Sequence, residues 1–188
     1  MLKIVESDKE ANHGKKVLVV VDMQNDFISG ALGSPDAQAI VENVAAKIKA
    51  FDGEIFYTLD THDESYKTSQ EGTHLPVEHC VEGSKGWELA PAILEAAPID
   101  AENVYCKNQF GSVELAEDLR DLNDMEPLES VELVGLCTDI CVVSNAMLLK
   151  AFLPEVPVIV DGSCCAGVTT AKHEAALETM RSCQIIVK

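Results

Sequence analysis

Short, almost uninterrupted apolar runs recur along this chain, and amphipathic stretches separate them. The runs are rich in valine and isoleucine, as in KVLVVVD and VPVIVD. Strands that are apolar at nearly every position are typical of parallel sheets, because both faces of such a sheet pack against helices. We therefore predict a mostly parallel sheet, with strands at 16–22, 54–60, 103–107, 131–137, 156–161 and 183–188.

Helical patterns lie between the predicted strands, at 35–51, 112–123, 139–152 and 169–182. The first begins with Ser34, a good capping residue, and Pro35, whose missing N–H is not needed in the first turn. This order of elements predicts a three-layer α/β/α protein with helices on both faces of the sheet. A chain of 188 residues supports one core of this kind, so we expect a single domain over 1–188.

The composition argues against several classes of partner. Fourteen basic and 32 acidic residues give a formal net charge of −18, which repels nucleic acid phosphates and anionic lipids. No apolar stretch reaches ~20 residues, the length of a membrane span, and the opening segment lacks the apolar core of a signal peptide. The seven cysteines lie mostly within apolar runs, which favours reduced thiols. We expect a cytoplasmic protein without nucleic acid or membrane partners.

Chemically reactive side chains follow most of the predicted strands. The carboxyl ends of parallel strands share one edge of the sheet, and ligands bind there. The reactive residues at or just beyond these ends are Asp22, Asp60, Lys107, Cys141 and Asp161. Each alone has an ordinary explanation as a turn former, a surface lysine or a buried thiol. Because all five fall at one edge, we expect them to share a crevice.

Cys141 is the candidate nucleophile. It would lie in the first turn of a helix that begins near Thr138 or Asp139, where the helix dipole and free amides lower the pKa of a thiol. The ammonium group of Lys107 would lower that pKa further. Asp22 could hold the thiol proton, deliver it to a leaving amine and later accept a proton from water. These residues predict a cysteine hydrolase.

The segment 61–86 is too long for an ordinary connection and therefore indicates a functional loop. Asp60 and His62 are two positions apart at a strand end, so their side chains face the same way and can share a metal ion. Glu71 or a later histidine could complete the coordination, the candidates being His74 and His79. Imidazole and carboxylate ligands suit a divalent ion, zinc before iron or manganese.

Two cysteine pairs allow a competing interpretation, a zinc or redox module without catalysis. Cys137 precedes Cys141 by four positions, and Cys164 adjoins Cys165. A lone pair of this spacing lacks the second pair of a zinc finger, and adjacent cysteines form strained disulfides. The cysteine hydrolase therefore remains the leading interpretation.

Three segments resemble the isochorismatase-like cysteine hydrolases, and within them the nicotinamidase/pyrazinamidase branch. VLVVVDMQNDFISGAL is similar to the opening strand with its catalytic aspartate, KNQFG to the catalytic lysine segment and GLCTDICVVSNA to the nucleophile segment. With DTHDES and HLPVEHCVEGSKGWEL, the resemblance extends over roughly residues 17–187. It implies catalytic roles for Asp22, Lys107 and Cys141.

The resemblance also implies the architecture and the reaction. A six-stranded parallel sheet of order 3-2-1-4-5-6 is expected, in a homo-oligomer that is commonly a dimer or tetramer. A divalent ion would be held by Asp60, His62 and His79, and some members add a ligand at the position of Glu71. The substrate would be a small amide that forms a thioester with Cys141. Nicotinamide, cleaved to nicotinate and ammonia in NAD salvage, is the leading choice, and another small amide is the alternative.

One position departs from the branch. Nicotinamidases usually carry an aromatic residue that stacks on the pyridine ring three positions before the last histidine ligand, and Pro76 occupies that position here. Phe27 matches the other ring-packing aromatic, and Trp87 or Phe110 could replace the missing one. The departure favours the alternative of a different small amide.

The resemblance further implies a cis peptide bond from Leu136 to Cys137, which would turn the Cys137 amide toward the nucleophile. Two preorganised backbone donors stabilise the oxyanion of a tetrahedral intermediate. On this interpretation Cys137 contributes its backbone N–H, and Cys141 contributes its N–H and its sulfur.

Overall fold

One six-stranded parallel sheet forms the centre of the protein in a computed structural model that describes residues 14–188. The order β3-β2-β1-β4-β5-β6 confirms the predicted α/β class and strand order. Residues 1–13 of the predicted domain lie outside the described part. The strands are β1 (Lys15–Val21), β2 (Glu54–Asp60), β3 (Val104–Lys107), β4 (Leu128–Leu136), β5 (Val158–Ala166) and β6 (Ile186–Val187).

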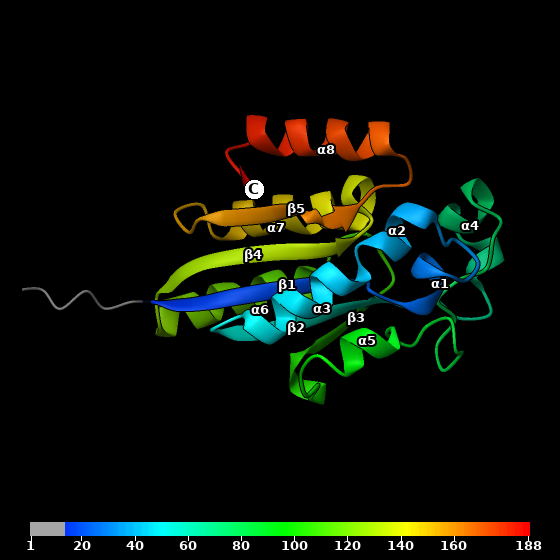
Figure 1. Ribbon diagram of the computed structural model, residues 1–188, viewed down its shortest axis with the longest axis horizontal. Coiled ribbons are helices and arrows are strands. Elements are labelled where there is room, and N and C mark those ends of the chain that lie inside the picture. The colour runs from blue at the N-terminus through cyan, green and yellow to red at the C-terminus, as the bar shows by residue number, and fades with distance from the viewer. Residues whose placement is uncertain (1–13) are drawn as a thin grey trace, which may run out of the picture.

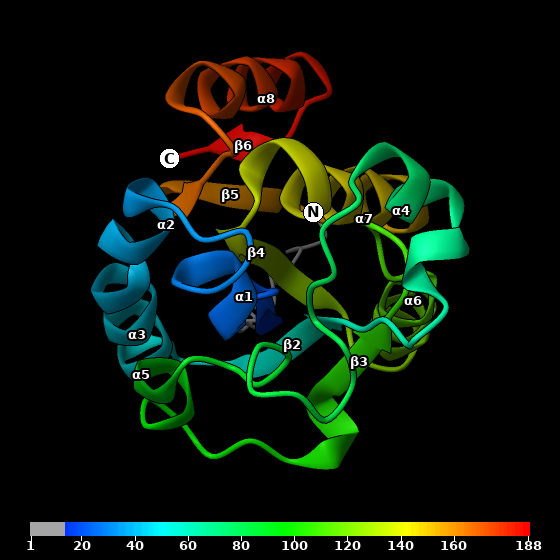
Figure 2. The same cartoon turned by 90° about the vertical axis from the view of Figure 1, so that its right-hand side faces the viewer.

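Helices cover both faces of this sheet (Figure 1, Figure 2). Alternate side chains of β1 point to opposite faces: Val17 and Val19 join one apolar core, whereas Leu18 and Val20 join the other. The predicted three layers are therefore confirmed. The first of these cores includes α6 (Val113–Met125), α7 (Val143–Phe152) and α8 (Thr170–Ser182), and the second includes α1 (Asn25–Ile28), α2 (Pro35–Ala39), α3 (Val41–Ala50) and α5 (Pro91–Leu94).

The predicted helix over 35–51 is divided in two. Ile40 separates α2 from α3, so the single continuous helix was wrong. Its start is as predicted, because the Ser34 hydroxyl accepts a hydrogen bond from the Ala37 N–H at 3.0 Å. In the described part of the chain, every helix falls short of the length and apolarity needed to cross a bilayer.

The long connection after β2 carries short helices. These are the 3-10 turn η1 (Tyr66–Thr68) and α4 (Gln70–His74), and a later 3-10 turn, η2 (Ala101–Asn103), leads into β3. A bridge between His62 and Val81 ties the ends of the connection together. Figure 1 places α1 and α4 beyond the carboxyl ends of the strands. The connection therefore stands over the edge at which the reactive residues were expected.

A glycine is required where β4 approaches β1. Gly135 has a φ of +118°, and a Cβ atom there would clash with the carbonyl oxygen of Val21. Any side chain at this position would push the two central strands apart. The close approach holds the end of β4, which leads to the nucleophile segment, beside the end of β1, which leads to Asp22.

Candidate active site

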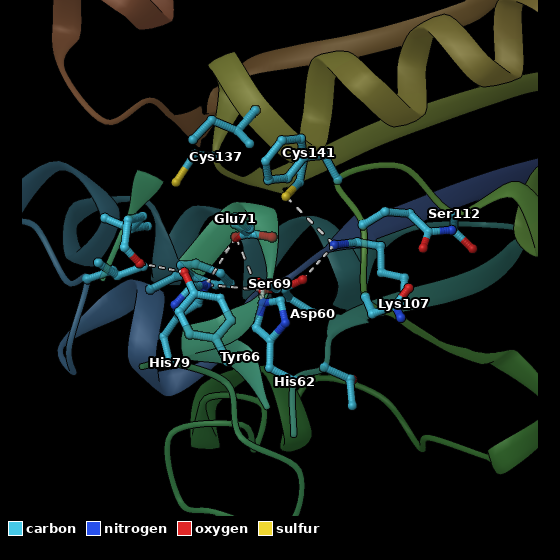
Figure 3. A pocket seen from close by; sticks show the side chains of 18 of the residues that line it. Asp60, His62, Tyr66, Ser69, Glu71, His79, Lys107, Ser112, Cys137 and Cys141 are labelled. Atoms are coloured by element: carbon cyan, nitrogen blue, oxygen red, sulfur yellow. Dashed lines mark hydrogen bonds and ion pairs between the residues drawn. The ribbon is translucent and has the colours of Figure 1, made fainter. Parts of the chain in front are cut away.

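A cavity of about 1450 Å³ opens at the carboxyl edge of the sheet. Its walls come from the α1–α2 region, the connection after β2, the segment after β3, and η3 (Thr138–Val142), the π-helical turn that precedes α7. Figure 3 shows the side chains of Lys107 and Cys141 directed toward each other inside it. The predicted site residues that line the cavity are Phe27, Asp60, His62, Glu71, His79, Lys107, Cys137 and Cys141.

Asp22 lies behind the cavity, directly after β1. Its side chain is completely buried, and one carboxylate oxygen, Oδ2, is 2.7 Å from Lys107 Nζ. The Thr58 hydroxyl donates a hydrogen bond to the other oxygen, Oδ1, at 2.6 Å. The φ of Asp22 is +46°, a left-handed conformation uncommon outside glycine, at the point where the chain leaves the strand for α1. Local backbone geometry and two polar contacts thus fix this carboxylate in place.

Lys107 connects the acidic groups of the site. Its Nζ is 2.7 Å from Asp22 Oδ2, 3.4 Å from Asp60 Oδ1 and 3.7 Å from Cys141 Sγ. Burial alone would lower the pKa of this ammonium group, but the Asp22 carboxylate raises it well above its ordinary value. Lys107 therefore remains charged and places a fixed cation between the acid and the thiol.

The environment of Cys141 differs from the prediction. Burial and the Asp22 carboxylate raise the pKa of its thiol well above the ordinary value, and Lys107 opposes this shift only in part. The predicted lowering of the pKa was therefore wrong for the resting site. The physical reason is burial, which favours the neutral thiol.

Asp22 shows a matching shift. Burial raises the pKa of its carboxyl group, and Lys107 opposes the shift without cancelling it. Because both groups resist ionisation beside one ammonium ion, a single negative charge can pass between them. Transfer of the proton from Cys141 to Asp22 would therefore create a thiolate next to Lys107 without changing the net charge of the site.

Cys137 precedes η3, and its peptide bond with Leu136 is cis, as expected. Burial raises the pKa of the Cys137 thiol to about 12, so this thiol is neutral near pH 7. All seven cysteines, including Cys164 and Cys165, are free thiols. The metal-ligand cluster found within residues 14–188 contains no cysteine. The zinc or redox interpretation of the cysteine pairs therefore has no support in the described structure.

Asp60, His62 and His79 form a buried cluster suited to a metal ion, with one ligand atom of each lying within 4.8 Å of the others. Asp60 Oδ2 is 3.0 Å from His62 Nε2 and 3.4 Å from His79 Nε2. Glu71 stands at the rim, with Oε1 3.9 and 3.8 Å from the same two nitrogens. His74 is exposed and lies outside the cluster. Of the candidates left open, Glu71 and His79 are therefore the ones brought to this point.

The donor atoms have spacings that fit a divalent ion. Ligands about 2.0–2.1 Å from a tetrahedral zinc ion are separated by about 3.3 Å, close to the nitrogen–oxygen distances of this cluster. His79 donates its Nδ1–H to the carbonyl oxygen of Val77 at 2.8 Å, which leaves Nε2 as the free ligand atom of the neutral ring. Burial alone would raise the pKa of Asp60, but its close contacts with the His62 and His79 rings and with the Lys107 ammonium group hold that pKa well below its ordinary range. Asp60 is thus an anion at neutral pH.

Gln24 and Tyr66 support the cluster, although the sequence patterns did not indicate them. The buried Gln24 side chain donates to the Asp60 carbonyl oxygen and accepts from the Asp60 N–H, both at 2.8 Å. The Tyr66 ring lies 4.6 Å from the His62 ring and 5.0 Å from the His79 ring. Its place two positions after Asp22 was the available signal for Gln24, since a polar residue within a buried segment must find partners.

The aromatic lining of the cavity includes Phe27 and one of the two residues considered as replacements for an aromatic at position 76. Phe27 lines the cavity with its ring 5.5 Å from that of His79. Pro76 is exposed and does not line the cavity. Of the two proposed replacements, Phe110 lines it, whereas Trp87 lies outside it and donates its indole N–H to the Thr61 hydroxyl.

Asp161 does not reach the cavity, so its predicted place there was wrong. The fifth strand continues past it to Ala166, with an irregular register opposite β4. Its carboxylate instead lies 2.5 Å from Lys47 Nζ and accepts hydrogen bonds from the backbone and hydroxyl of Ser163. The aspartate interrupts an apolar run without ending the strand.

Comparisons with known proteins agree with this geometry. Residues 16–188 match the Isochorismatase domain family. The isochorismatase family protein PncA of Bacillus subtilis is 28% identical, over 87% of this chain and 92% of its own. The nicotinamidase/pyrazinamidase of Mycobacterium tuberculosis is 29% identical, over 90% of this chain and 96% of its own.

Solved structures give the same result. Nicotinamidase/pyrazinamidase PncA from Bacillus subtilis has a TM-score of 0.77 at 26% identity, covering 92% of this chain and 98% of its own. The pyrazinamidase of Pyrococcus horikoshii in complex with zinc has a TM-score of 0.74 at 27% identity, covering 93% and 98%. Since the family match spans all but the first residue of the sheet and every residue of the site described above, the chain belongs to the isochorismatase domain family.

Proposed function

We propose that this protein is a metal-assisted cysteine amidohydrolase that converts nicotinamide to nicotinate and ammonia in NAD salvage. The observation that carries the proposal is the position of Lys107 Nζ, 2.7 Å from Asp22 and 3.7 Å from Cys141. This arrangement supplies a nucleophile, a proton carrier and a fixed cation at one cavity. The nicotinamidase/pyrazinamidase relatives support the choice of amide.

The reaction follows from the shared proton of Asp22 and Cys141. The thiol proton passes to Asp22, and the Cys141 thiolate attacks the carboxamide carbon. The backbone N–H groups of Cys137 and Cys141 stabilise the oxyanion. Asp22 then gives its proton to the departing ammonia, which leaves a thioester on Cys141. Asp22 next accepts a proton from water as the water attacks the thioester. It returns this proton to the Cys141 sulfur, which restores the thiol, and the released nicotinic acid ionises to nicotinate.

The metal site would assist this chemistry. Asp60, His62 and His79 would hold a divalent ion, with Glu71 as a further ligand, and zinc is preferred over iron or manganese. When bound, the ion would supply Lewis acidity to the cavity. Phe27 would pack against the substrate ring.

The cellular setting is also part of the proposal. We place the enzyme in the cytoplasm, as a homodimer or homotetramer. The formal net charge of −18 supports the absence of nucleic acid partners, because it opposes binding to phosphate backbones.

Ammonia release from nicotinamide and from pyrazinamide tests the proposal. The protein would be purified without chelator, its metal content measured, and the assay repeated with Cys141→Ala. We expect turnover of nicotinamide that the variant lacks. Absence of turnover by metal-loaded wild-type protein would reject nicotinamide as the substrate, and activity of the variant would reject the nucleophile.

A second candidate is hydrolysis of a primary amide with a larger apolar acyl group. Pro76 supplies no aromatic ring to stack on a pyridine. Four of the exposed large apolar side chains in the described part line the cavity, namely Leu75, Phe110, Val113 and Val168. Such side chains at the mouth of a cavity favour an apolar extension of the ligand. Comparing kcat/KM for benzamide and 4-butylbenzamide with that for nicotinamide decides between the two candidates.

A further inference from the structure

The two peptide groups that flank the nucleophile are held by side chains from the following helix turn. Cys141 lies in a wide turn in which the Val142 N–H donates to the Cys137 carbonyl oxygen at 3.1 Å. The Ser144 hydroxyl donates to the Ile140 carbonyl oxygen at 2.6 Å, and the Asn145 amide donates to the Cys141 carbonyl oxygen at 2.8 Å. Turns of this π type are rare and need local support.

Asn145 also reaches a second segment. Its Oδ1 accepts a hydrogen bond from the Ser112 N–H at 2.9 Å, and its Nδ2 donates to the Phe110 carbonyl oxygen at 3.3 Å. Only 1% of this residue is exposed, so every polar atom of its side chain needs a protein partner. The partners divide between the turn that carries Cys141 and the segment that follows Lys107.

The segment that follows Lys107 makes further contacts near this one. A Cβ atom at Gly111 would clash with the Leu148 side chain of α7, which shows how closely the segment packs on that helix. The Ser112 hydroxyl accepts a hydrogen bond from the Leu115 N–H and so caps α6. Asn145 is therefore the polar link between a packed segment and the nucleophile turn.

We propose that Asn145 is a positioning residue that sets the separation of Lys107 and Cys141, which is 3.7 Å from Nζ to Sγ. Asn145 does not line the cavity and acts only through the two segments that it joins. A displacement of about 1 Å between reacting groups lowers a rate about a hundredfold, so a loosened link should slow the reaction without weakening substrate binding. Its effect on turnover rests on the proposed function, whereas its effect on the geometry of the thiol does not.

Two substitutions test separately the contacts that Asn145 makes with the nucleophile turn and with the Lys107 segment. Asn145→Ser keeps a bond to the Cys141 carbonyl oxygen through its hydroxyl, since serine in a helix can donate to the carbonyl four residues earlier, but it is too short to reach Phe110 or Ser112. Asn145→Asp keeps the acceptor for the Ser112 N–H and lacks an N–H for the two carbonyl oxygens. Ser144→Ala is the matched control, because it removes the neighbouring bond to Ile140 and leaves the link intact.

Two readouts distinguish positioning from simple stability. Steady-state kinetics give kcat and KM, and the pH dependence of Cys141 alkylation by iodoacetamide reports the influence of Lys107 on the thiol, with Cys141→Ala as background. For both Asn145 variants we expect kcat to fall by about tenfold to a hundredfold, KM to stay within about threefold, and the alkylation midpoint to move to higher pH. Ser144→Ala should lower kcat less than either Asn145 variant and leave the alkylation midpoint at the wild-type pH, because the contact between the turn and the Lys107 segment stays intact.

Circular dichroism and metal content would confirm that each variant is folded. If one Asn145 variant fails to fold, the other still decides the question. Wild-type kcat and alkylation profile in Asn145→Ser would overturn the link to the Lys107 segment, and an equal loss in Ser144→Ala would reduce Asn145 to general support of the helix. Failure of wild type to cleave nicotinamide would reject the proposed function alone, because the alkylation profile needs no amide substrate.

Discussion

Lys107 Nζ lies 2.7 Å from Asp22 Oδ2, and both side chains are almost completely buried. The carboxylate stands behind the cavity wall rather than in it, since Asp22 does not line the cavity. A proton carrier in this place serves the thiol on one side of the ammonium group without contacting the body of the substrate.

Replacing Asp22 should therefore act on the rate of the chemical step. We expect Asp22→Asn to lower kcat by about 10²- to 10⁴-fold, the usual contribution of general acid–base catalysis, with KM nearly unchanged. Steady-state kinetics on the folded variant measure both. Wild-type kcat in this variant would exclude Asp22 as the proton carrier.

The two cysteines at the cavity should respond differently. Cys141 Sγ is 3.7 Å from Lys107 Nζ, whereas the Cys137 thiol has a pKa of about 12 and remains protonated. We expect Cys141→Ala to abolish amidase activity and to retain metal, and Cys137→Ala to keep kcat within about threefold of wild type. Equal losses in the two variants would contradict these roles.

Metal content should depend more on the buried ligands His62 and His79 than on Glu71 at the rim of the cluster. His62→Ala and His79→Ala each remove a nitrogen from the cluster with Asp60, and we expect either to lose metal during dialysis. Glu71→Gln should weaken retention about tenfold, since a ligand at the rim is replaced by a weaker oxygen donor. Elemental analysis after dialysis against increasing chelator concentrations ranks the variants by metal retention. Retention by both histidine variants would place the metal elsewhere.

An aromatic residue at position 76 should improve binding of a pyridine ring. Pro76 is exposed beside Leu75, which lines the cavity. Stacking contributes about 0.5–1.5 kcal/mol, so Pro76→Trp should lower KM for nicotinamide by about 2- to 10-fold with little change in kcat. Pro76→Ala is the control for the loss of proline. If both variants behave alike, ring stacking does not occur at this position.

The ion pair of Lys47 should make stability depend on pH. Lys47 Nζ lies 2.6 Å from Glu132 Oε1 and 2.5 Å from Asp161 Oδ2. Burial alone would raise the pKa of Asp161, but hydrogen bonds from Lys47 and Ser163 lower it below its ordinary value. A depressed carboxyl pKa adds stability above the unfolded value of about 4, and this stability is lost as the pH falls through the folded value.

Removal of the lysine reverses this dependence. We expect Lys47→Met to lower the free energy of unfolding by about 3 kcal/mol at pH 7, because two nearly buried carboxylates lose their shared cation. The difference from wild type should shrink as the pH falls toward 4 and Asp161 becomes protonated. Urea denaturation at pH 7, 5 and 4 measures it. A constant difference would mean that Lys47 acts through packing alone.

The sequence was sufficient for the sheet and for the convergence of most reactive residues. Apolar runs defined the parallel strands, and parallel strands bring Asp22, Asp60 and Lys107 to one edge whatever the details of the loops. The same reasoning gave a wrong position for Asp161, because a charged residue can lie within a strand when a lysine from a helix, here Lys47, pairs with it.

The direction of the Cys141 pKa shift was harder to predict from the sequence. The sequence places Cys141 at a helix start near a lysine, and both features lower a thiol pKa. Its burial depends on how the segments around the cavity pack, and burial outweighs both effects. For the same reason no pattern in the sequence indicated that Asn145 contacts Ser112, since their contact joins segments that are 33 positions apart.

The sheet ends on both sides in short strands, four residues in β3 and two in β6, whereas β4 and β5 each have nine. Short outer strands offer few free backbone groups to a strand from another molecule. Within the described part of the chain, the sheet therefore presents little template for cross-β growth. Association between copies that leads to defined oligomers, rather than to fibrils, would then use surfaces other than the edges of the sheet.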